Sequence, residues 1–266
     1  MRRKDADEVR KAVRESYAGI AQRGGTSCCS PRRSCCAEPA TAAQARSARL
    51  GYSASELEGV PEGADMGLGC GNPQAIAALR KGEVVLDLGS GGGFDCFLAA
   101  KRVGKAGRVI GVDMTPEMVS KARENARKAG CRNVDFRLGE IEHLPAADNS
   151  VDVIISNCVI NLSPDKVGVY REAFRVLRPG GRIAIFDVVA TRELPDDLRK
   201  DTDLLSGCIS GAVTIRKLQG ILRKAGFAEI RIEPKQASRE YIKEWAPGRG
   251  IEDYIVSAAI EAAKPG

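Results

Sequence analysis

The sequence is poor in several features that mark large classes of protein. It holds one histidine and one tryptophan, and aromatic residues make up only 5% of its 266 residues. No stretch approaches the roughly 18 apolar residues of a membrane-spanning helix. Arg2, Arg3 and Lys4 open the chain, but the apolar core of a signal peptide does not follow them. We therefore expect a cytoplasmic protein that works under reducing conditions and has no membrane partner.

The charged residues give no sign of a nucleic-acid partner. The net charge is +6, but no block of Lys and Arg is long enough for a nucleic-acid-binding arm. A hydrophobic fraction of 43% suits a globular protein with a sizeable core. His143, the only histidine, lies in a loop segment, where a structural place is expected rather than acid–base catalysis. Nothing in the sequence requires more than a monomer.

Strand-like and helical patterns alternate from residue 83 onward, which predicts an α/β fold with a mostly parallel sheet. Strands are predicted at 84–88, 108–113, 133–138, 151–156, 181–188, 227–232 and 254–262. Helices are predicted at 94–103, 116–129, 164–177, 214–225 and 237–246. The expected architecture is a Rossmann-like sheet of seven strands with helices on both faces.

The first 49 residues are predicted to form an appendage on this core. Residues 5–22 have apolar positions at helical spacing and predict a helix that packs as a lid or flank. Residues 24–47 are rich in Gly, Ser, Pro, Ala and Cys without apolar periodicity, which predicts a mobile arm. We expect residues 50–235 to form the core, and residues 236–266 to add a helix and the last strand.

The most informative segment is a glycine-rich loop between a strand and a helix. Residues 85–93 read Val-Leu-Asp-Leu-Gly-Ser-Gly-Gly-Gly, and Asp113 ends the next apolar run. The glycines permit a tight turn and a close approach of the backbone to a ligand. The carboxylate of Asp113 can accept hydrogen bonds from two ribose hydroxyls. The G-x-G-x-G spacing departs from the nicotinamide or flavin pattern, and no lysine follows at P-loop spacing.

This loop resembles the first motif of the S-adenosylmethionine-dependent methyltransferases. The segment RVLRPGG at 175–181 is a second motif that resembles this class of enzyme. Gly89, Asp113, Glu140 and Asn157 each follow a predicted strand, so they are expected to converge at one edge of the sheet. Resemblance and position favour Glu140 near the adenine, with Ile141 packed on its ring and Glu142 as a surface acid. The residues expected to bind the cofactor are Asp87, Gly89, Ser90, Gly91, Asp113, Met114, Glu140, Ile141 and Asn157.

Three of the nine cysteines lie in loops that can reach the same edge. Cys70 is in a glycine-rich loop before the first strand, Cys158 follows the fourth strand, and Cys208 is flanked by glycines after the fifth. They are 88 and 50 residues apart, too far for a local finger motif. By contrast, Cys96 is expected in the core and Cys131 on the surface.

Five segments around these loops resemble the arsenite S-adenosylmethionine methyltransferases. They are GLGCGNP at 67–73, VDMTPEM at 112–118, LGEIEHLP at 138–145, SNCVINLSPDK at 156–166 and GCISGA at 207–212. The resemblance implies that Cys70, Cys158 and Cys208 bind trivalent arsenic. Trivalent arsenic is soft, and soft ions prefer thiolate ligands. The resemblance further implies S-adenosylmethionine as methyl donor, arsenite (as a thiol conjugate) as substrate, mono- and dimethylated arsenicals as products, and glutathione or thioredoxin as reductant.

Other interpretations stay open at this point. A methyltransferase for an organic small molecule fits the cofactor loop equally well, but gives no reason for the three placed cysteines. A protein that binds arsenite without turning it over fits the paired cysteines of the arm. Those four residues could gather arsenite, form a redox disulfide with a core cysteine, or have no role; they are Cys28, Cys29, Cys35 and Cys36.

Overall fold

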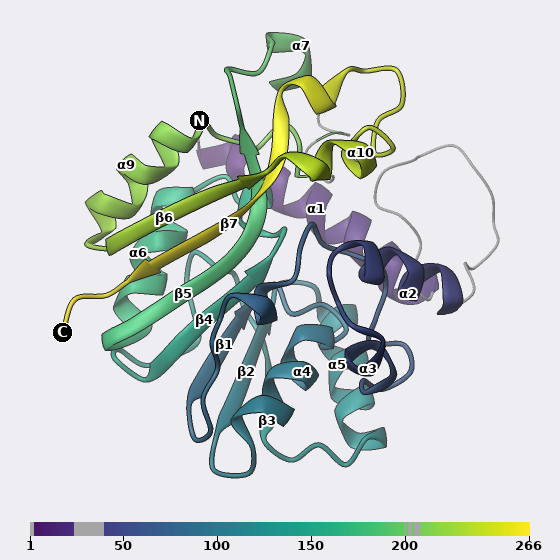
Figure 1. The fold of residues 1–266 in the computed structure, drawn as a ribbon, viewed down its shortest axis with the longest axis vertical. Helices are drawn as coiled ribbons and strands as arrows, with labels where there is room; N and C mark the ends of the chain where they lie inside the picture. The colour runs from purple at the N-terminus through teal and green to yellow at the C-terminus, as the bar shows by residue number, and fades with distance from the viewer. Residues whose placement is uncertain (1–2, 24–39, 200, 202–203, 205–207) are drawn as a thin grey trace.

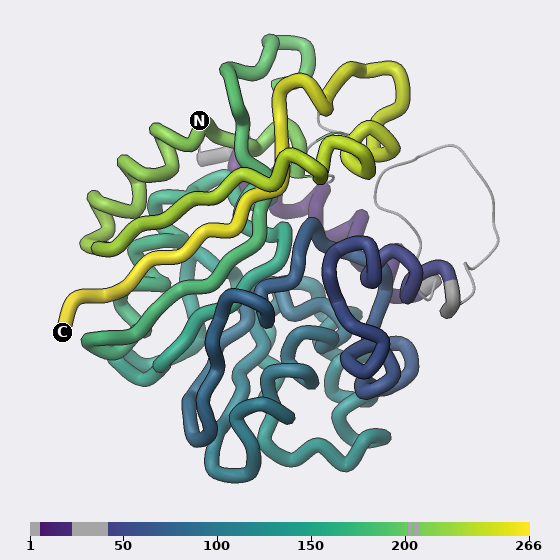
Figure 2. The backbone as a smooth tube through the Cα atoms, in the orientation of Figure 1, coloured from purple at the N-terminus to yellow at the C-terminus, as the bar shows by residue number. Residues whose placement is uncertain are grey.

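The computed structural model describes residues 3–23, 40–199, 201, 204 and 208–266. Seven strands form one sheet in the order β3-β2-β1-β4-β5-β7-β6, which confirms the predicted fold class (Figure 1). The strands are β1 (Val84–Leu88), β2 (Arg108–Asp113), β3 (Val134–Leu138), β4 (Val151–Asn157), β5 (Leu177–Ala190), β6 (Ala228–Lys235) and β7 (Ile255–Ala263). The four pairs among β1 to β5 are parallel, and β7 is antiparallel to both of its neighbours. Figure 2 shows β7 lying between β5 and β6.

The helices cover both faces of this sheet. The longer ones are α1 (Arg3–Arg23), α2 (Ala40–Arg49), α4 (Phe94–Val103), α5 (Pro116–Lys128), α6 (Lys166–Val176) and α9 (Ile215–Ala225). The shorter ones are α3 (Ala54–Glu58), η1 (Pro73–Ala75), η2 (Ile160–Leu162), α7 (Asp196–Arg199), η3 (Gln236–Ser238), α10 (Arg239–Ile242) and η4 (Ile251–Asp253).

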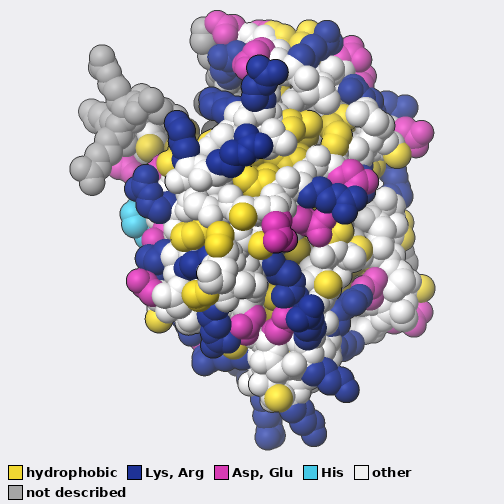
Figure 3. Space-filling model, turned by 60° about the vertical axis from the view of Figure 1, so that its left-hand side comes forward, with side chains coloured by type: hydrophobic (Ala, Val, Ile, Leu, Met, Phe, Trp, Pro, Cys, Tyr) yellow, Lys and Arg dark blue, Asp and Glu magenta, His cyan; other side chains and the backbone are white. Residues whose placement is uncertain are grey.

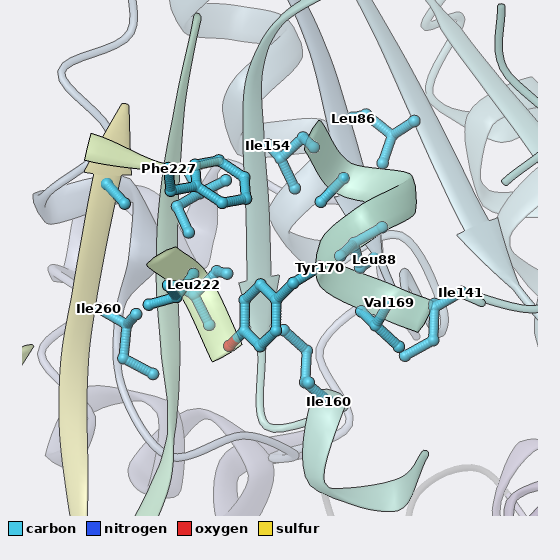
Figure 4. Close-up of a cluster of buried hydrophobic side chains, with 14 of the residues drawn as sticks. Leu86, Leu88, Ile141, Ile154, Ile160, Val169, Tyr170, Leu222, Phe227 and Ile260 are labelled. Carbon is cyan, nitrogen blue, oxygen red and sulfur yellow. The ribbon is translucent and has the colours of Figure 1, made fainter. Parts of the chain in front are cut away.

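Alternate residues of each central strand face opposite layers, as the two-residue period of a strand requires. Val85 of β1 and Val109 of β2 pack with α4 and α5. Their neighbours Leu86 and Ile110 pack with α6 and α9 on the other face. Figure 4 shows this second cluster around the ring of Tyr170, a fully buried residue of α6. Burial on both faces explains why these strands read as unbroken apolar runs in the sequence.

The structure corrects two expectations about the ends of the chain. Residues 40–47 belong to helix α2, whereas a mobile arm was predicted there. Ser47 of this helix is buried and donates a hydrogen bond of 2.8 Å to Asp65, so tertiary contacts hold a segment that lacks apolar periodicity. The predicted helix 237–246 is broken into η3 and α10 and ends at Ile242, before Trp245. The paired cysteines of the arm lie outside the described residues.

Charged side chains of both signs are mixed on the surface (Figure 3), as expected from a sequence without a long block of Lys and Arg. Figure 3 shows Lys and Arg interspersed with Asp and Glu over one face, with hydrophobic side chains gathered in the upper half of the view. Within the described parts of the chain, no helix is both long and apolar enough to cross a bilayer.

The order of the strands determines where on the sheet a ligand can bind. From β1 the chain moves outward through β2 and β3, and then returns to place β4 and β5 on the other side of β1. The connections after β1 and β4 therefore leave the sheet in opposite directions and open a crevice at their carboxyl ends. Gly89 follows β1 and Asn157 ends β4, so both lie at this crevice.

Candidate functional site

A cavity of about 430 Å³ lies at this crevice, within the range of small-molecule sites. Its wall includes seven of the predicted cofactor or arsenic residues; they are Gly89, Asp113, Met114, Ile141, Asn157, Cys158 and Cys208. Residues of α1 and α2 also line the cavity; they are Arg10, Val13, Tyr17, Arg46 and Arg49. The cavity thus joins the predicted cofactor loop to two of the three predicted arsenic ligands.

The glycine-rich loop has the backbone that close approach of a ligand requires. Gly89, Gly91 and Gly93 have φ angles of +70°, +51° and +93°, in the left-handed region that glycine adopts most easily. The backbone N–H of Gly91 donates a 2.9 Å hydrogen bond to the carboxylate of Asp113, which ties the loop to the end of β2. Burial raises the pKa of Asp113.

The donors and acceptors of this loop fit a nucleoside with a polar tail. Each carboxylate oxygen of Asp113 accepts one backbone N–H, from Gly91 and Thr115, and has a further lone pair for a ribose hydroxyl. Among the described residues, the buried hydroxyl of Ser90 has no hydrogen-bond partner, so a polar ligand group would satisfy it. Ile141 adds an apolar wall suited to a base. The site therefore fits S-adenosylmethionine.

Four predicted cofactor residues do not appear among the described residues of the cavity wall. Asp87 is buried in β1, where its carboxylate accepts a hydrogen bond from Cys96. Glu140 faces α1, with an oxygen 3.5 Å from the guanidinium of Arg10. The other two are Ser90 and Gly91. Direct contact of these four with the cofactor stays a prediction.

The three predicted arsenic ligands come together in space. The sulfurs of Cys70 and Cys158 and a carboxylate oxygen of Asp187 all lie within 4.8 Å of one another. The thiol of Cys208 donates a hydrogen bond of 2.8 Å to the carbonyl oxygen of Cys158. Three loops that are far apart in the sequence thus place three thiols in one cluster beside the cavity.

The backbone around this cluster is strained and closely packed. Cys158 and Cys208 have φ angles of +58° and +62°, a conformation that non-glycine residues adopt rarely and that often marks functional sites. Glycines beside the cysteines allow the loops to touch. A side chain at Gly71 would collide with the ring of Phe186, and one at Gly211 would collide with the backbone of Asn161.

The two neighbouring thiols raise the pKa of Cys158. The neighbouring thiol groups of Cys208 and Cys70, together with burial, raise the pKa of Cys158 well above its ordinary value. Cys70 and Cys208 are themselves almost fully buried, at 1% and 3% exposure. Cys158 therefore rests as a protonated thiol beside two thiols that have little access to bulk water.

Asp187, near the end of β5, is part of this site but was not predicted as a site residue from the sequence. Its carboxylate accepts hydrogen bonds from the backbone N–H groups of Ile160 and Asn161, at 2.9 and 3.2 Å, and from the side chain of Asn161 at 2.9 Å. Burial raises its pKa to about 6. These bonds hold the turn that follows Cys158. An acid inside the apolar run IAIFDVV was the available signal.

The remaining cysteines and the histidine fall outside the cluster. Cys96 is fully buried, as expected, whereas Cys131 is half-buried rather than exposed. The side chain of His143 is 81% exposed, in the loop between β3 and β4. Glu142, expected at the surface, is buried and pairs with Arg10 at 3.3 Å.

Comparisons with known proteins agree with this arrangement. Residues 79–226 match the family described as a methyltransferase domain. An arsenite methyltransferase of Halobacterium salinarum is 55% identical, over 98% of this chain and 68% of that protein. Another, of Aquipseudomonas alcaligenes, is 47% identical over 63% of this chain and 50% of that protein.

A solved structure of an arsenic methyltransferase is also similar to this chain. The crystal structure of an arsenic(III) S-adenosylmethionine methyltransferase from Chlamydomonas reinhardtii superposes with a TM-score of 0.63 at 36% identity, covering 85% of this chain and 73% of that one. Since the similarity to the Halobacterium protein extends over nearly the whole chain, this protein belongs to the arsenite methyltransferase family.

Proposed function

We propose that this protein transfers a methyl group from S-adenosylmethionine to trivalent arsenic bound by Cys70, Cys158 and Cys208. The observation that supports the proposal most strongly is the meeting of these three cysteines next to the cavity of the glycine-rich loop. Three thiolates bind trivalent arsenic as a pyramid and leave its lone pair on the opposite side. Thiolates are the donors that a soft, thiophilic ion prefers.

A protonated thiol at Cys158 suits the capture of arsenite. Each Cys–SH that bonds to arsenic in As(OH)₃ replaces one hydroxide, which leaves with the thiol proton as water. Three exchanges therefore release three waters and need no external base. A thiol conjugate of arsenite exchanges in the same way, because each displaced thiolate takes up the proton of the incoming cysteine. The raised pKa of the Cys158 thiol therefore does not oppose binding.

The contribution of the protein to methyl transfer is mainly positioning. Bound S-adenosylmethionine supplies an electrophilic sulfonium methyl group for the arsenic lone pair, so no side chain needs to act as a nucleophile. Gly89 lies directly against Val159, the residue after Cys158, which brings the cofactor loop and the thiol loop into contact. Holding two reactants in line in this way contributes up to roughly 7–11 kcal/mol in favourable cases.

Methyl transfer formally oxidises arsenic by two electrons. A thiol reductant, glutathione or thioredoxin, must therefore return two electrons before a second methyl group is added. Two such rounds give mono- and then dimethylated arsenicals. We also propose that the enzyme is a monomer and acts in the cytoplasm. Which reductant serves the protein is decided by comparing turnover with each.

The direct test is methylation by the purified protein. Arsenite, glutathione and S-adenosylmethionine should yield methylated arsenicals, measured by chromatography coupled to mass spectrometry. Cys158→Ser and Cys208→Ser should abolish the products while calorimetry shows unchanged cofactor binding. Cys131→Ser, a half-buried thiol outside the cluster, is the matched control and should remain active. Full activity of the two serine variants would exclude these cysteines as the arsenic ligands. Cofactor binding without any methylated arsenical from the wild-type protein would favour an organic substrate, and absent cofactor binding a protein that only binds arsenite.

A further inference from the structure

Cys70 differs from the other two cysteines of the cluster in how it reaches the site. It precedes β1, so no strand end delivers it to the carboxyl edge of the sheet. The residue that links its loop to this edge is Asn157, the last residue of β4. The side-chain oxygen of Asn157 accepts a hydrogen bond of 2.9 Å from the backbone N–H of Cys70. Its side-chain nitrogen donates one of 2.7 Å to the carbonyl oxygen of Gly71.

The second N–H of the Asn157 amide is also used. It donates to the hydroxyl of Tyr52 at 3.1 Å, and this hydroxyl lies 2.9 and 3.0 Å from the two carboxylate oxygens of Asp95. Asp95 lies in the first turn of α4, the helix that follows the cofactor loop. The amide of Asn157 is therefore fixed in one orientation by partners on two different segments, the Cys70 loop and Tyr52. Since both of its N–H groups are engaged, it has none left to donate to a cofactor.

The loop is fitted to this amide. A Cβ at Gly69 would lie 2.7 Å from the side-chain nitrogen of Asn157, so only glycine allows the loop to come this close. On its other side, the carbonyl oxygen of Cys70 accepts hydrogen bonds from Tyr241 at 2.9 Å and Ser257 at 2.6 Å. The peptide groups on both sides of the Cys70 side chain are thus held, which fixes the direction of its thiol.

We propose that Asn157 is a positioning residue that holds Cys70 as the third arsenic ligand. This inference rests on the proposed function and assigns to Asn157 a role in substrate binding rather than the predicted role in cofactor binding. The positioning role of Asn157 also determines which arsenicals need this residue for tight binding. Arsenite has three exchangeable bonds and uses all three thiols. A monosubstituted trivalent arsenical has two exchangeable bonds, which Cys158 and Cys208 can satisfy without Cys70.

The test compares Asn157→Ala and the isosteric Asn157→Asp with the matched control Asn133→Ala. Asn133 also donates from its side chain to two backbone carbonyls, those of Ala100 and Gly104 at 3.0 Å each, but it precedes β3 at the opposite edge of the sheet. Titrations of the full chain measure affinity for arsenite, for phenylarsine oxide and for S-adenosylhomocysteine. The double variant Asn157→Ala/Cys70→Ser closes a thermodynamic cycle.

We expect both Asn157 variants to lose at least about tenfold in arsenite affinity, since a half-buried hydrogen-bonded amide is removed or loses its donors. Affinity for phenylarsine oxide and S-adenosylhomocysteine should stay within about twofold of wild type, and the loss should not add to that of Cys70→Ser. The inference is overturned if arsenite affinity is unchanged, if all three ligands weaken together, or if the two losses add in full.

The outcomes separate this inference from the proposed function. If the wild-type protein and Asn133→Ala bind arsenite and the Asn157 variants bind it equally well, only the role of Asn157 is wrong. If the wild-type protein itself does not bind arsenite, the proposed function fails and takes this inference with it.

Discussion

The thiol of Cys208 donates a hydrogen bond of 2.8 Å to the carbonyl oxygen of Cys158. Two residues 50 positions apart in the sequence therefore meet through the side chain of one and the backbone of the other. Cys208 cannot donate this bond once its proton is lost and its sulfur binds arsenic. The contact belongs to the unliganded site, and its loss accompanies the formation of the arsenic cage.

This bond separates the stabilising role of Cys208 from its role in arsenic binding. Cys208→Ser keeps a hydroxyl that can donate to the Cys158 carbonyl, whereas Cys208→Ala does not. Both variants should lose high-affinity arsenite binding. Only Cys208→Ala should also lower the free energy of unfolding, by about 1–3 kcal/mol, because it leaves a buried carbonyl without its donor. Urea denaturation of the two variants checks this, and equal stabilities would contradict it.

The reactivity of Cys158 should reflect its raised pKa. Only the thiolate reacts with iodoacetamide. The neighbouring thiols of Cys208 and Cys70, together with burial, disfavour the thiolate of Cys158. The pH at half-maximal alkylation rate should lie well above that of an ordinary cysteine. Mass spectrometry of the Cys158 peptide from pH 7 to 10.5 measures it. The same residue in urea-unfolded protein is the control, and a midpoint equal to or below that of the unfolded chain would disprove the expectation.

Gly89→Ala should damage the cofactor site more than backbone strain alone explains. Gly89 has a φ of +70° and a side chain there would collide with Val159. Gly130 has a similar φ of +61° but open space around it, so Gly130→Ala isolates the cost of the left-handed backbone, about 1–2 kcal/mol. Calorimetry should show S-adenosylhomocysteine affinity reduced at least about tenfold in Gly89→Ala and unchanged in Gly130→Ala. Similar affinities in both variants would refute this interpretation.

Asp95 should make the protein less stable as the pH rises. Burial raises the pKa of this carboxyl to about 6 in the folded protein, from an ordinary value of 3.8. The folded state therefore binds its proton more tightly than the unfolded chain, and stability falls as pH rises through that interval. Asp95→Asn should reduce the fall between pH 4 and 7 by up to about 3 kcal/mol. Urea titrations at several pH values measure it, with the exposed Asp253→Asn as control; an unchanged fall would contradict the assignment.

The sequence predicted the sheet well because both faces of its central strands are buried. The runs beginning at Val84 and Arg108 have no polar alternation to obscure them, and the structure has both strands at the predicted bounds. Glycine loops at strand ends then predicted a crevice that gathers distant residues. The grouping of Cys70, Cys158 and Cys208 followed from a family resemblance, and the structure places them together.

What the sequence did not predict depends on long-range contacts. Helix α2 has no apolar stripe, and its place is set by contacts such as that between Ser47 and Asp65. Asp187 looked like one polar residue in an apolar strand, because its hydrogen bonds come from a turn 26 and 27 residues earlier. Asn157 was predicted at the site as a cofactor residue, and its hydrogen bond with the Cys70 loop was not predicted, since nothing in the sequence indicates that this loop folds back to it.

The central claim is that three protein thiols hold one arsenic atom beside the cofactor cavity. X-ray absorption at the arsenic edge, on protein loaded with arsenite and freed of small thiols, counts the atoms bound to arsenic. We predict three sulfurs in the wild-type protein and two sulfurs in Cys70→Ser, Cys158→Ser or Cys208→Ser. Arsenic that keeps oxygen neighbours in the wild-type protein, or a sulfur count that none of these substitutions changes, would contradict the account.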